Sequence, residues 1–565
     1  MSSKLNSAFA SLMMRQFGGG DEPFFMDLIQ SARDGHLCMK RKTPPSLPTA
    51  ALYHASEMSD LLFPLEPIVR FHDWYYLQRN WVYETHICQH IRRLSKCFCE
   101  KPIQLTEKQR EGLTPLQAEA VERALNSPLT VISGGPGTGK TYTAGQIIRI
   151  LSELYRNNLK NRDFGKEAPQ NFLSGTNDHC RKQGMSEDKN FGVKPMQTKT
   201  DSSGCFGINV KPLYKVCITA PTGKAAQHLR NGLSSLEGSI DIRADTLHRL
   251  LGLTPGASKL FSGFQIDADV IIVDEASMID VDLWAHLLEA VSDQTKLILM
   301  GDPDQLPPVE AGSIFSDLSD LFAVRLRQCM RTDKRELQEF SAAIQQGNMD
   351  GAMQCLQAGL GVFSPIDPKQ LYDKLSIPLF STKPDPCECL QEFQRTKILG
   401  ALRQGPLGID RLNALFLEFY KGTFRKGHFW AVPILISSNA PHLGLYNGSS
   451  GVLMGSCDEG FNPERATAYF FDPLSEAMRS FVPSILPSYE LAFCLSVHKS
   501  QGSEFDHVFA LFPPGSEKFG REALYTAATR SRKSLQIAIA PSTLEIMLGQ
   551  CFRKQSNLVE RVIVI

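Results

Sequence analysis

The sequence lacks several features that would assign its class at once. Its 60 basic and 60 acidic residues cancel, so no overall charge draws it to a polyanion, and a nucleic-acid groove would need local segregation of charge. No apolar run approaches the roughly 18 residues of a membrane-spanning helix, and the first residues do not read as a charged segment followed by an apolar leader. We therefore expect a cytoplasmic protein without a membrane partner.

Metal-binding cysteine patterns are also missing. The 14 cysteines are scattered, and the two close pairs, Cys97 with Cys99 and Cys387 with Cys389, have C-x-C spacing instead of the C-x-x-C spacing of zinc knuckles. We interpret these cysteines as free thiols. The length of 565 residues and the hydrophobic content of 42% predict several globular domains with a large core.

The sequence does contain a complete phosphate-binding loop. Residues 133–141 read Ser-Gly-Gly-Pro-Gly-Thr-Gly-Lys-Thr and lie between an apolar, β-branched run, 129–133, and a segment with helical spacing, 142–153. Glycines let backbone N–H groups approach phosphate oxygens, Lys140 can reach the β- and γ-phosphates, and Thr141 can offer its hydroxyl to Mg²⁺. The alternative is a glycine-rich turn that binds no ligand. The predicted phosphate-binding residues are Gly134, Gly135, Pro136, Gly137, Thr138, Gly139, Lys140 and Thr141.

Polar residues suited to a nucleotide follow the next two predicted strands. The apolar run 270–273 ends in Asp274 and Glu275, which are placed to hold Mg²⁺ through water and to orient the attacking water, respectively. The alternative is an acidic turn. The run 297–300 is followed by Gln305, whose amide could bond to the γ-phosphate and report its loss. Because ligands of open α/β sheets collect at the carboxyl ends of strands, we expect these groups to converge.

Three more distant residues complete the predicted nucleotide site. Gln117 precedes a helix, and its amide offers the donor and acceptor that an adenine edge requires, although a solvated helical glutamine is the alternative. Arg331 and Arg530 could stabilise charge on the transferring phosphoryl group from a second lobe. The predicted catalytic residues are thus Lys140, Asp274, Glu275, Gln305, Arg331 and Arg530.

The strand candidates predict an α/β fold in which a parallel-sheet pattern appears twice. The aromatic-rich segment 64–94 predicts a small helical domain, and the polar stretch 156–210 predicts a mobile surface insertion. Segment 365–392 shows no clean period, and no structure is assigned to it. The predicted strands are 129–133, 216–219, 270–273, 297–300, 434–437, 507–511 and 535–540.

Together these segments resemble superfamily 1 helicases, and among them the RecD family, the alpha subunit of exodeoxyribonuclease V (RecBCD). The resemblance runs from residue 61 to about residue 540, and its specificity comes from the order of several motifs. They are Leu113-Thr-Pro-Leu-Gln117, the phosphate loop, Ala220-Pro-Thr-Gly-Lys-Ala-Ala226, Thr246-Leu-His-Arg-Leu-Leu251, Asp274-Glu-Ala-Ser277, Gly301-Asp-Pro-Asp-Gln305, Val497-His-Lys-Ser-Gln-Gly-Ser-Glu504 and Tyr525-Thr-Ala-Ala-Thr-Arg530.

The resemblance implies two RecA-like P-loop motor domains with parallel sheets, at 106–335 and 336–565. It also implies a helical N-terminal domain, 1–105, that docks on a partner subunit, and a small β-barrel-like insertion at about 425–490. The polar insertion at 156–210 is longer than the family pattern, and Ala440 stands where an acidic residue is expected.

The resemblance further implies an ATP- and Mg²⁺-dependent DNA helicase that moves 5′ to 3′ in double-strand-break repair and recombination. Its expected partners are single-stranded DNA, duplex DNA ends and the beta and gamma subunits of exodeoxyribonuclease V, with the nuclease on another subunit. Gly502 and Glu504 would lie near the nucleotide and the lobe interface. The implied DNA contacts are Pro221, Thr222, His248, His498 and Lys499.

Other interpretations stay open at this point. The chain could be a structural subunit whose ATP site stabilises an assembly, or a solitary RecD-like helicase. A P-loop kinase is a third alternative, but it leaves the second lobe without a use.

Overall fold

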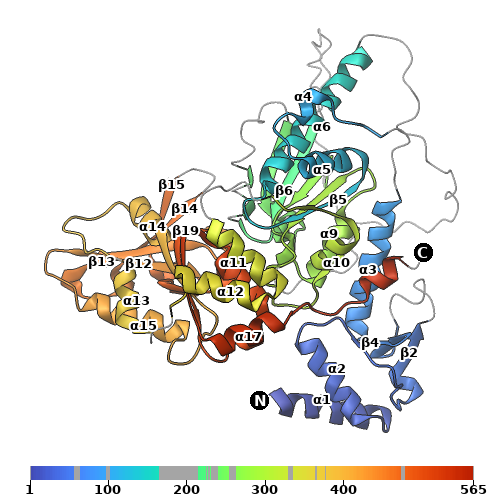
Figure 1. Ribbon diagram of the computed structural model, residues 1–565, viewed down its shortest axis with the longest axis horizontal. Coiled ribbons are helices and arrows are strands. Elements are labelled where there is room, and N and C mark those ends of the chain that lie inside the picture. The colour runs from blue at the N-terminus through green and yellow to red at the C-terminus, as the bar shows by residue number, and fades with distance from the viewer. Residues whose placement is uncertain are drawn as a thin grey trace, which may run out of the picture.

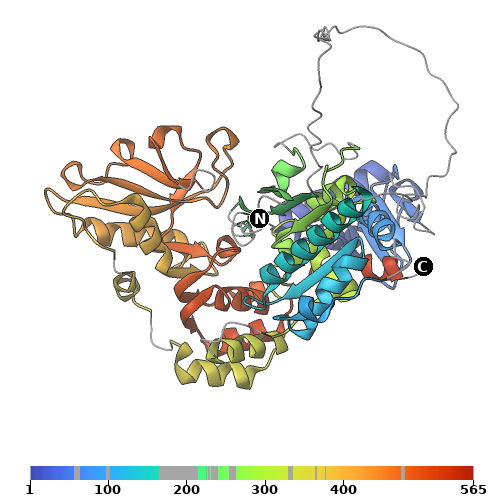
Figure 2. The same ribbon diagram turned by 90° about the horizontal axis from the view of Figure 1, so that it is seen from above.

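The protein has two lobes built on parallel β-sheets, which face each other across a cleft (Figures 1 and 2). An N-terminal region packs beside the first lobe. The computed structural model describes residues 2–55, 64–96, 102–163, 214–223, 225–226, 229–230, 240–253, 263–328, 335–362, 366–375, 377–472 and 477–563.

The first lobe contains six parallel strands in the order β10-β5-β9-β8-β6-β7. Helices cover both faces, so neighbouring residues of one strand enter different cores: Ile271 packs with α9 and α10, whereas Ile272 packs with α5 and α6. This burial on both faces explains the continuous apolar runs of the sequence. The elements are β5 (Leu129–Gly134), β6 (Tyr214–Ala220), β7 (Ile240–Thr246), β8 (Val270–Val273), β9 (Lys296–Gly301), β10 (Ala323–Leu326), α4 (Glu107–Arg110), α5 (Pro115–Asn126), α6 (Lys140–Asp163), α8 (Leu247–Leu250), α9 (Val281–Ala290) and α10 (Ile314–Phe322).

The second lobe contains four parallel strands in the order β17-β11-β18-β19. Its strands also alternate between two cores, with Val508 on one face and Phe509 on the other. The predicted α/β class with two parallel sheets is therefore confirmed. The elements are β11 (Thr396–Gly400), β17 (Cys494–Ser496), β18 (Phe505–Phe512), β19 (Ser531–Ile539), α11 (Arg335–Gln346), α12 (Met349–Cys355), α13 (Pro368–Lys374), α14 (Pro386–Arg395), α15 (Ile409–Lys421), α16 (Gly520–Ala528) and α17 (Pro541–Gly549).

An antiparallel sheet of five strands is inserted in the second lobe, in the order β15-β14-β13-β12-β16. The run 434–437 overlaps β12 of this sheet, within the range predicted for the insertion at about 425–490, and only its place in the parallel-sheet pattern was wrong. An apolar run alone does not reveal the direction of its partner strand. Among the described residues the sheet is open, with β15 and β16 at its edges, and the barrel-like fold stays a prediction. The strands are β12 (Phe429–Ile436), β13 (Ser450–Ser456), β14 (Thr467–Asp472), β15 (Ala477–Phe481) and β16 (Tyr489–Leu491).

The N-terminal region is not purely helical, which corrects the prediction. It contains a four-stranded sheet in the order β1-β4-β3-β2 beside its helices. Aromatic residues favour strands, and the aromatic run that we interpreted as helical divides into β4 and the start of α3. The elements are α1 (Ser2–Phe17), α2 (Glu22–Arg33), β1 (Cys38–Lys40), β2 (Leu52–Ala55), β3 (Ile68–Phe71), β4 (Trp74–Leu77) and α3 (Gln78–Ser95).

Two further segments differ from their predicted treatment. Segment 365–392, left without structure, holds α13 and the start of α14, because each helix begins at a proline behind an aspartate cap, Asp367 or Asp385. The insertion predicted at 156–210 starts as the helical end of α6, and its residues from 164 onward lie outside the described residues.

The C-terminal residues do not stay with the second lobe. Helix α18 (Leu558–Ile563) packs on α3 and α10, and Leu558 is buried in the core of the first lobe (Figure 1). The prediction that assigned everything from residue 336 to the second motor domain is thus wrong for this segment. A search of the described helices for one that is long and apolar enough to cross a membrane found none.

Candidate active site

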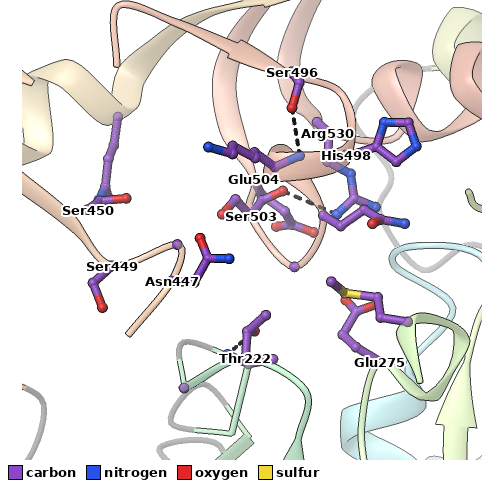
Figure 3. Close-up of a pocket in the computed structure, with 18 of the residues that line it drawn as sticks. Thr222, Glu275, Asn447, Ser449, Ser450, Ser496, His498, Ser503, Glu504 and Arg530 are labelled. Atoms are coloured by element: carbon purple, nitrogen blue, oxygen red, sulfur yellow. Dashed lines mark hydrogen bonds between the residues drawn. The ribbon is translucent and has the colours of Figure 1, made fainter. Parts of the chain in front are cut away.

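A cleft with a volume of about 2110 Å³ separates the two lobes and is lined by residues of both. Thr222 and Glu275 lie on the side of the first lobe, and His498, Ser503 and Arg530 lie opposite them (Figure 3). The predicted phosphate loop, acidic pair, sensor and Arg530 all contribute to its lining. Tertiary structure therefore brings together residues that are almost 400 positions apart in the sequence.

The phosphate loop connects the end of β5 to the first residue of α6, which is Lys140. Gly137 and Gly139 have φ values of 75° and 85°, which suit glycine. The Lys140 ammonium donates to the carbonyls of Gly134 at 2.7 Å and Gly135 at 3.1 Å. The helix N-terminus and the loop N–H groups make a site that suits phosphate oxygens.

Gln117 contacts the backbone of the phosphate loop. Its side chain is 2% exposed, donates from Nε2 to the carbonyl of Thr138 at 3.3 Å, and accepts at Oε1 from the Thr114 N–H at 3.0 Å. A Cβ on Gly139 would lie 2.5 Å from Nε2 of Gln117. These contacts bind the amide to the loop backbone, and its predicted contact with adenine stays a prediction.

The acidic pair follows β8. Burial, and next the charge of Glu275, raise the pKa of Asp274 to about 6, while the charge of Lys140 opposes this shift. Glu275 adopts a φ of 51°, a left-handed conformation that costs a non-glycine residue about 1–3 kcal/mol. A divalent cation would favour the ionised Asp274, so its carboxylate at the cleft fits Mg²⁺, with the Thr141 hydroxyl available from the same cleft.

Gln305 lies in the loop after β9 and is 5% exposed. Its Nε2 donates to Oδ2 of Asp302 at 3.1 Å, whereas its Oε1 is buried without a hydrogen-bond partner among the described residues. Burial raises the pKa of Asp302. A buried, unpaired acceptor is costly unless a ligand or water donates to it, so Gln305 fits the predicted role at a nucleotide.

Direct hydrogen bonds connect this loop to the second lobe. The Tyr525 hydroxyl donates to Oδ2 of Asp302 at 3.0 Å, so Gln305 and Tyr525 share one carboxylate. The Leu306 N–H donates to Oγ1 of Thr526 at 2.9 Å, and Nε2 of Gln501 donates to the Leu306 carbonyl at 2.8 Å. Sequence reasoning assigned no role to Tyr525, although its hydroxyl in the motif that ends in Arg530 was an available signal.

Arg530 follows α16 and is 3% exposed. Its guanidinium donates to the carbonyls of Thr526 at 3.2 Å and Ser503 at 3.3 Å, and to the Thr529 hydroxyl at 3.2 Å. These partners are neutral, so they leave the charge of Arg530 available at the cleft surface. Arg331, the other predicted arginine, lies outside the described residues.

The residues implied as DNA contacts are only partly gathered in the cleft. Thr222, His498 and Lys499 line it, whereas Pro221 precedes Thr222 and is not among the lining residues, and His248 is exposed on α8 outside it. Burial lowers the pKa of His498. The Lys499 ammonium donates to Oε1 of Glu490 at 2.7 Å.

Gly502 and Glu504, expected near the nucleotide and the lobe interface, both line the cleft. A Cβ on Gly502, whose φ is 68°, would lie 3.4 Å from the Thr222 hydroxyl across the cleft. Arg532 donates to Glu504 at 3.0 Å. The glycine thus permits a close approach of the two lobes.

Sequence reasoning missed a group of cationic and aromatic residues on the second-lobe side of the cleft. No motif marks them, because they come from several elements and only the fold brings them together. Cations that contact a phosphate backbone and aromatic rings that stack on bases are the features of a groove for single-stranded nucleic acid. The residues are Arg395, Arg403, Arg479, Lys518, Tyr446, Phe471 and Phe519.

Comparisons with known proteins extend over both lobes. Residues 112–361 match the AAA domain family, and residues 491–538 match the UvrD-like helicase C-terminal domain family. The "RecBCD enzyme subunit RecD" of Mycolicibacterium smegmatis is 27% identical over 94% of this chain and 92% of that protein, and that of Haemophilus influenzae is 26% identical over 86% and 79%. The "ATP-dependent RecD2 DNA helicase" of Deinococcus radiodurans is 26% identical over 81% of this chain and 53% of that protein.

Among solved structures, a Pif1 helicase from Candida albicans is 17% identical to this chain, with a TM-score of 0.40 over 79% of this chain and 97% of that chain. The fold and the site define a two-lobed P-loop nucleoside triphosphatase of the helicase class. Within this class, the chain is similar to RecD proteins over most of its length.

Proposed function

We propose that the chain is an ATP-dependent DNA helicase that acts as the alpha subunit of a RecBCD-type helicase and nuclease in double-strand-break repair and recombination. The observation that carries this proposal is the Asp302 carboxylate, which accepts hydrogen bonds from Gln305 at the nucleotide side and from Tyr525 of the second lobe. A change at the γ-phosphate can therefore reach the second lobe through two hydrogen bonds.

The residues of the cleft suit ATP hydrolysis. In this proposal, the phosphate loop and Lys140 hold the phosphates, and Thr141 and Asp274 hold Mg²⁺, which supplies positive charge to the phosphate oxygens. Glu275 orients the attacking water, and Arg530 neutralises charge on the phosphoryl group from the second lobe. The predicted Arg331 would act in the same way.

The opposite wall of the cleft suits a DNA strand. Cations and aromatic rings line it, so a single strand can be held without base-specific contacts. Alternating closure and opening of the lobes around ATP would move the protein along this strand. Travel from 5′ to 3′ follows from the family resemblance and is part of the proposal.

The partners and the domain plan are also proposed. Helix α1 exposes Leu5 and Leu12, each 58% exposed and seven residues apart, which supports docking of the N-terminal region, 1–105, on the gamma subunit. The beta subunit, duplex DNA ends and the cytoplasm complete this assignment. Motor domains at 106–335 and 336–550 fit the two parallel sheets, with an insertion at about 425–490 that we propose to be barrel-like.

The test is ATP hydrolysis by the chain alone and with the beta and gamma subunits, with and without single-stranded DNA. We expect DNA to stimulate hydrolysis in at least one state, Lys140→Gln to abolish it without loss of subunit association, and Tyr525→Phe to unwind fewer base pairs per ATP. Absence of DNA stimulation in both states would contradict the motor function. Loss of assembly in Lys140→Gln would favour a structural subunit, and unwinding by the chain alone would favour a solitary helicase.

A further inference from the structure

We propose that residues 550–563, here called the C-terminal strap, hold residues 303–312, here called the sensor loop, in place against helix α16, and that Lys554 is the positioning residue at this contact. The inference deepens the proposed motor function, on which its kinetic part rests. The strap would then fix Gln305 relative to the helix that leads to Arg530.

The strap begins in contact with the N-terminal end of α16. The Phe552 N–H donates to Oε1 of Glu522 at 3.1 Å, and the Arg521 N–H donates to the carbonyl of Gln550 at 3.3 Å. A Cβ on Gly520 would collide with the Phe552 ring. Any displacement of α16 is therefore passed to the first residues of the strap.

The strap then crosses to the first lobe. The Arg553 guanidinium donates to Asp317 at 2.6 Å and also pairs with Asp320, both on α10. The Lys554 N–H donates to the Ser313 hydroxyl, which precedes α10, at 3.3 Å. The strap thus meets the chain at the point where the sensor loop ends.

Lys554 contacts the sensor loop itself. Its side chain is 8% exposed, and its ammonium donates to three consecutive carbonyls, those of Pro308, Val309 at 3.0 Å, and Glu310. Pro307 and Pro308 have no N–H, so this part of the loop has few backbone donors of its own. The three donors of an ammonium match the three acceptors, and the loop gains its fixed shape from the strap.

The far end of the strap is anchored in the N-terminal region. The Gln555 N–H donates to Nδ1 of His36 at 2.7 Å, and the Leu37 N–H donates to the Gln555 carbonyl at 2.8 Å. Further along, Arg561 donates to Glu84 at 2.9 Å and to Thr85 at 2.6 Å. Because both ends are fixed, the strap does not simply follow the second lobe. Movement of α16 relative to the first lobe would therefore change the position of Lys554 relative to the sensor loop.

The test uses the full chain with Lys554→Met, and exposed Lys369→Met as a matched control, since Lys369 pairs with Asp373 on the far helix α13. Hydrogen exchange of backbone amides in residues 303–312 should rise in Lys554→Met and stay unchanged in Lys369→Met. For DNA-stimulated hydrolysis, we expect kcat to fall about three- to tenfold, the size of one or two lost hydrogen bonds, with an unchanged KM for ATP.

A pH profile separates positioning from a merely structural role. Burial lowers the pKa of Lys554 to about 8, although the charges of Glu310 and Asp280 act to raise it. The other titratable groups that face Lys554 are His36 and His498. Its ammonium is lost as pH rises from 7 to 9. The ratio of wild-type to Lys554→Met kcat should therefore decrease over this range, and a constant ratio would contradict the positioning role.

The outcomes are distinguishable. Unchanged exchange in residues 303–312 of Lys554→Met overturns the strap proposal, even if DNA stimulates hydrolysis normally. Wild-type protein without DNA stimulation overturns the motor function, while the exchange experiment still decides the role of the strap. If Lys554→Met does not fold, Ser313→Ala removes the neighbouring strap contact, and the same segment should exchange faster in that variant. Unchanged exchange there would overturn the proposal.

Discussion

At the residue scale, the cleft contains groups that are unfavourable for stability. Asp274 is half-buried with a raised pKa, Glu275 has a left-handed backbone, and Oε1 of Gln305 is buried without a partner among the described residues. Each of these arrangements costs free energy in the folded protein. Their concentration around one phosphate loop indicates that ligand binding, and not folding, explains their presence.

Asp274→Asn should therefore stabilise the protein while it abolishes ATP hydrolysis. The pKa of Asp274 is about 6 when folded and about 3.8 when unfolded, so the folded state binds more protons and stability falls as pH rises from 4 to 6. Removing the carboxylate should raise the free energy of unfolding at pH 7 by on the order of 1–3 kcal/mol.

Urea unfolding at pH 7 and at pH 4, without nucleotide or Mg²⁺, measures this gain, which should shrink at pH 4. Exposed Asp27→Asn of α2 is the control and should change neither value. A less stable Asp274→Asn at pH 7 would show that the carboxylate contributes to folding.

At the element scale, the junction between β5 and α6 depends on close backbone approach. A Cβ on Gly134 would lie 2.7 Å from the Leu326 carbonyl of β10, and one on Gly139 would meet Gln117. The loop is thus confined between a neighbouring strand and the first turn of α5. This confinement fixes Lys140 at the start of α6.

Gly139→Ala should displace this junction, because the residue has a φ of 85° and its Cβ would lie 2.5 Å from Nε2 of Gln117. We expect ATP binding to weaken at least about tenfold, which corresponds to about 1.4 kcal/mol, within the usual cost of such strain. Calorimetric titration with ATP measures the effect. Gly549→Ala, where a Cβ meets no atom within 4 Å, is the matched control. Equal affinities of the two variants would rule out this role of Gly139.

At the scale of the whole molecule, three parts of the chain depend on one another. Tyr525 and Thr526 join the lobes beside the nucleotide site, and the C-terminal strap joins the second lobe to the N-terminal region. Arg561 and Glu84 form a fully buried ion pair in that region, and the guanidinium lies 4.1 Å from the centre of the Trp81 ring. The end of the chain is therefore part of the core of its beginning.

Arg561→Met should leave Glu84 buried without its cation. The loss of one partner of a buried ion pair typically costs about 3–5 kcal/mol, so the first lobe and N-terminal region should unfold at lower urea. The double variant Glu84→Gln with Arg561→Met should recover part of the loss. Urea unfolding followed by tryptophan fluorescence measures both. A single variant as stable as the wild type would show that the pair contributes nothing.

Much of the site could be predicted from the sequence, because its chemistry depends on short motifs. A buried strand followed by glycines and Lys140, or by Asp274 and Glu275, carries its function within a few residues. The sequence was less informative where elements are short or where pairing decides the structure. Residues 74–77 were interpreted as part of a helical segment but form a strand, and segment 365–392 was assigned no structure, although Pro368 and Pro386 each begin a helix.

The sequence by itself determined the nucleotide chemistry, the α/β class and the resemblance to the RecD family. Only the tertiary structure decided which residues of the two lobes and of the C-terminal strap contact one another. It brings the Tyr525 hydroxyl within hydrogen-bond distance of Asp302 and the Lys554 ammonium into contact with the sensor loop. It also places Arg395, Arg479 and the aromatic residues on one wall of the cleft. The physical reason is that a motif depends on local backbone geometry, whereas these contacts join residues that are up to about 250 positions apart and form only when both lobes have folded.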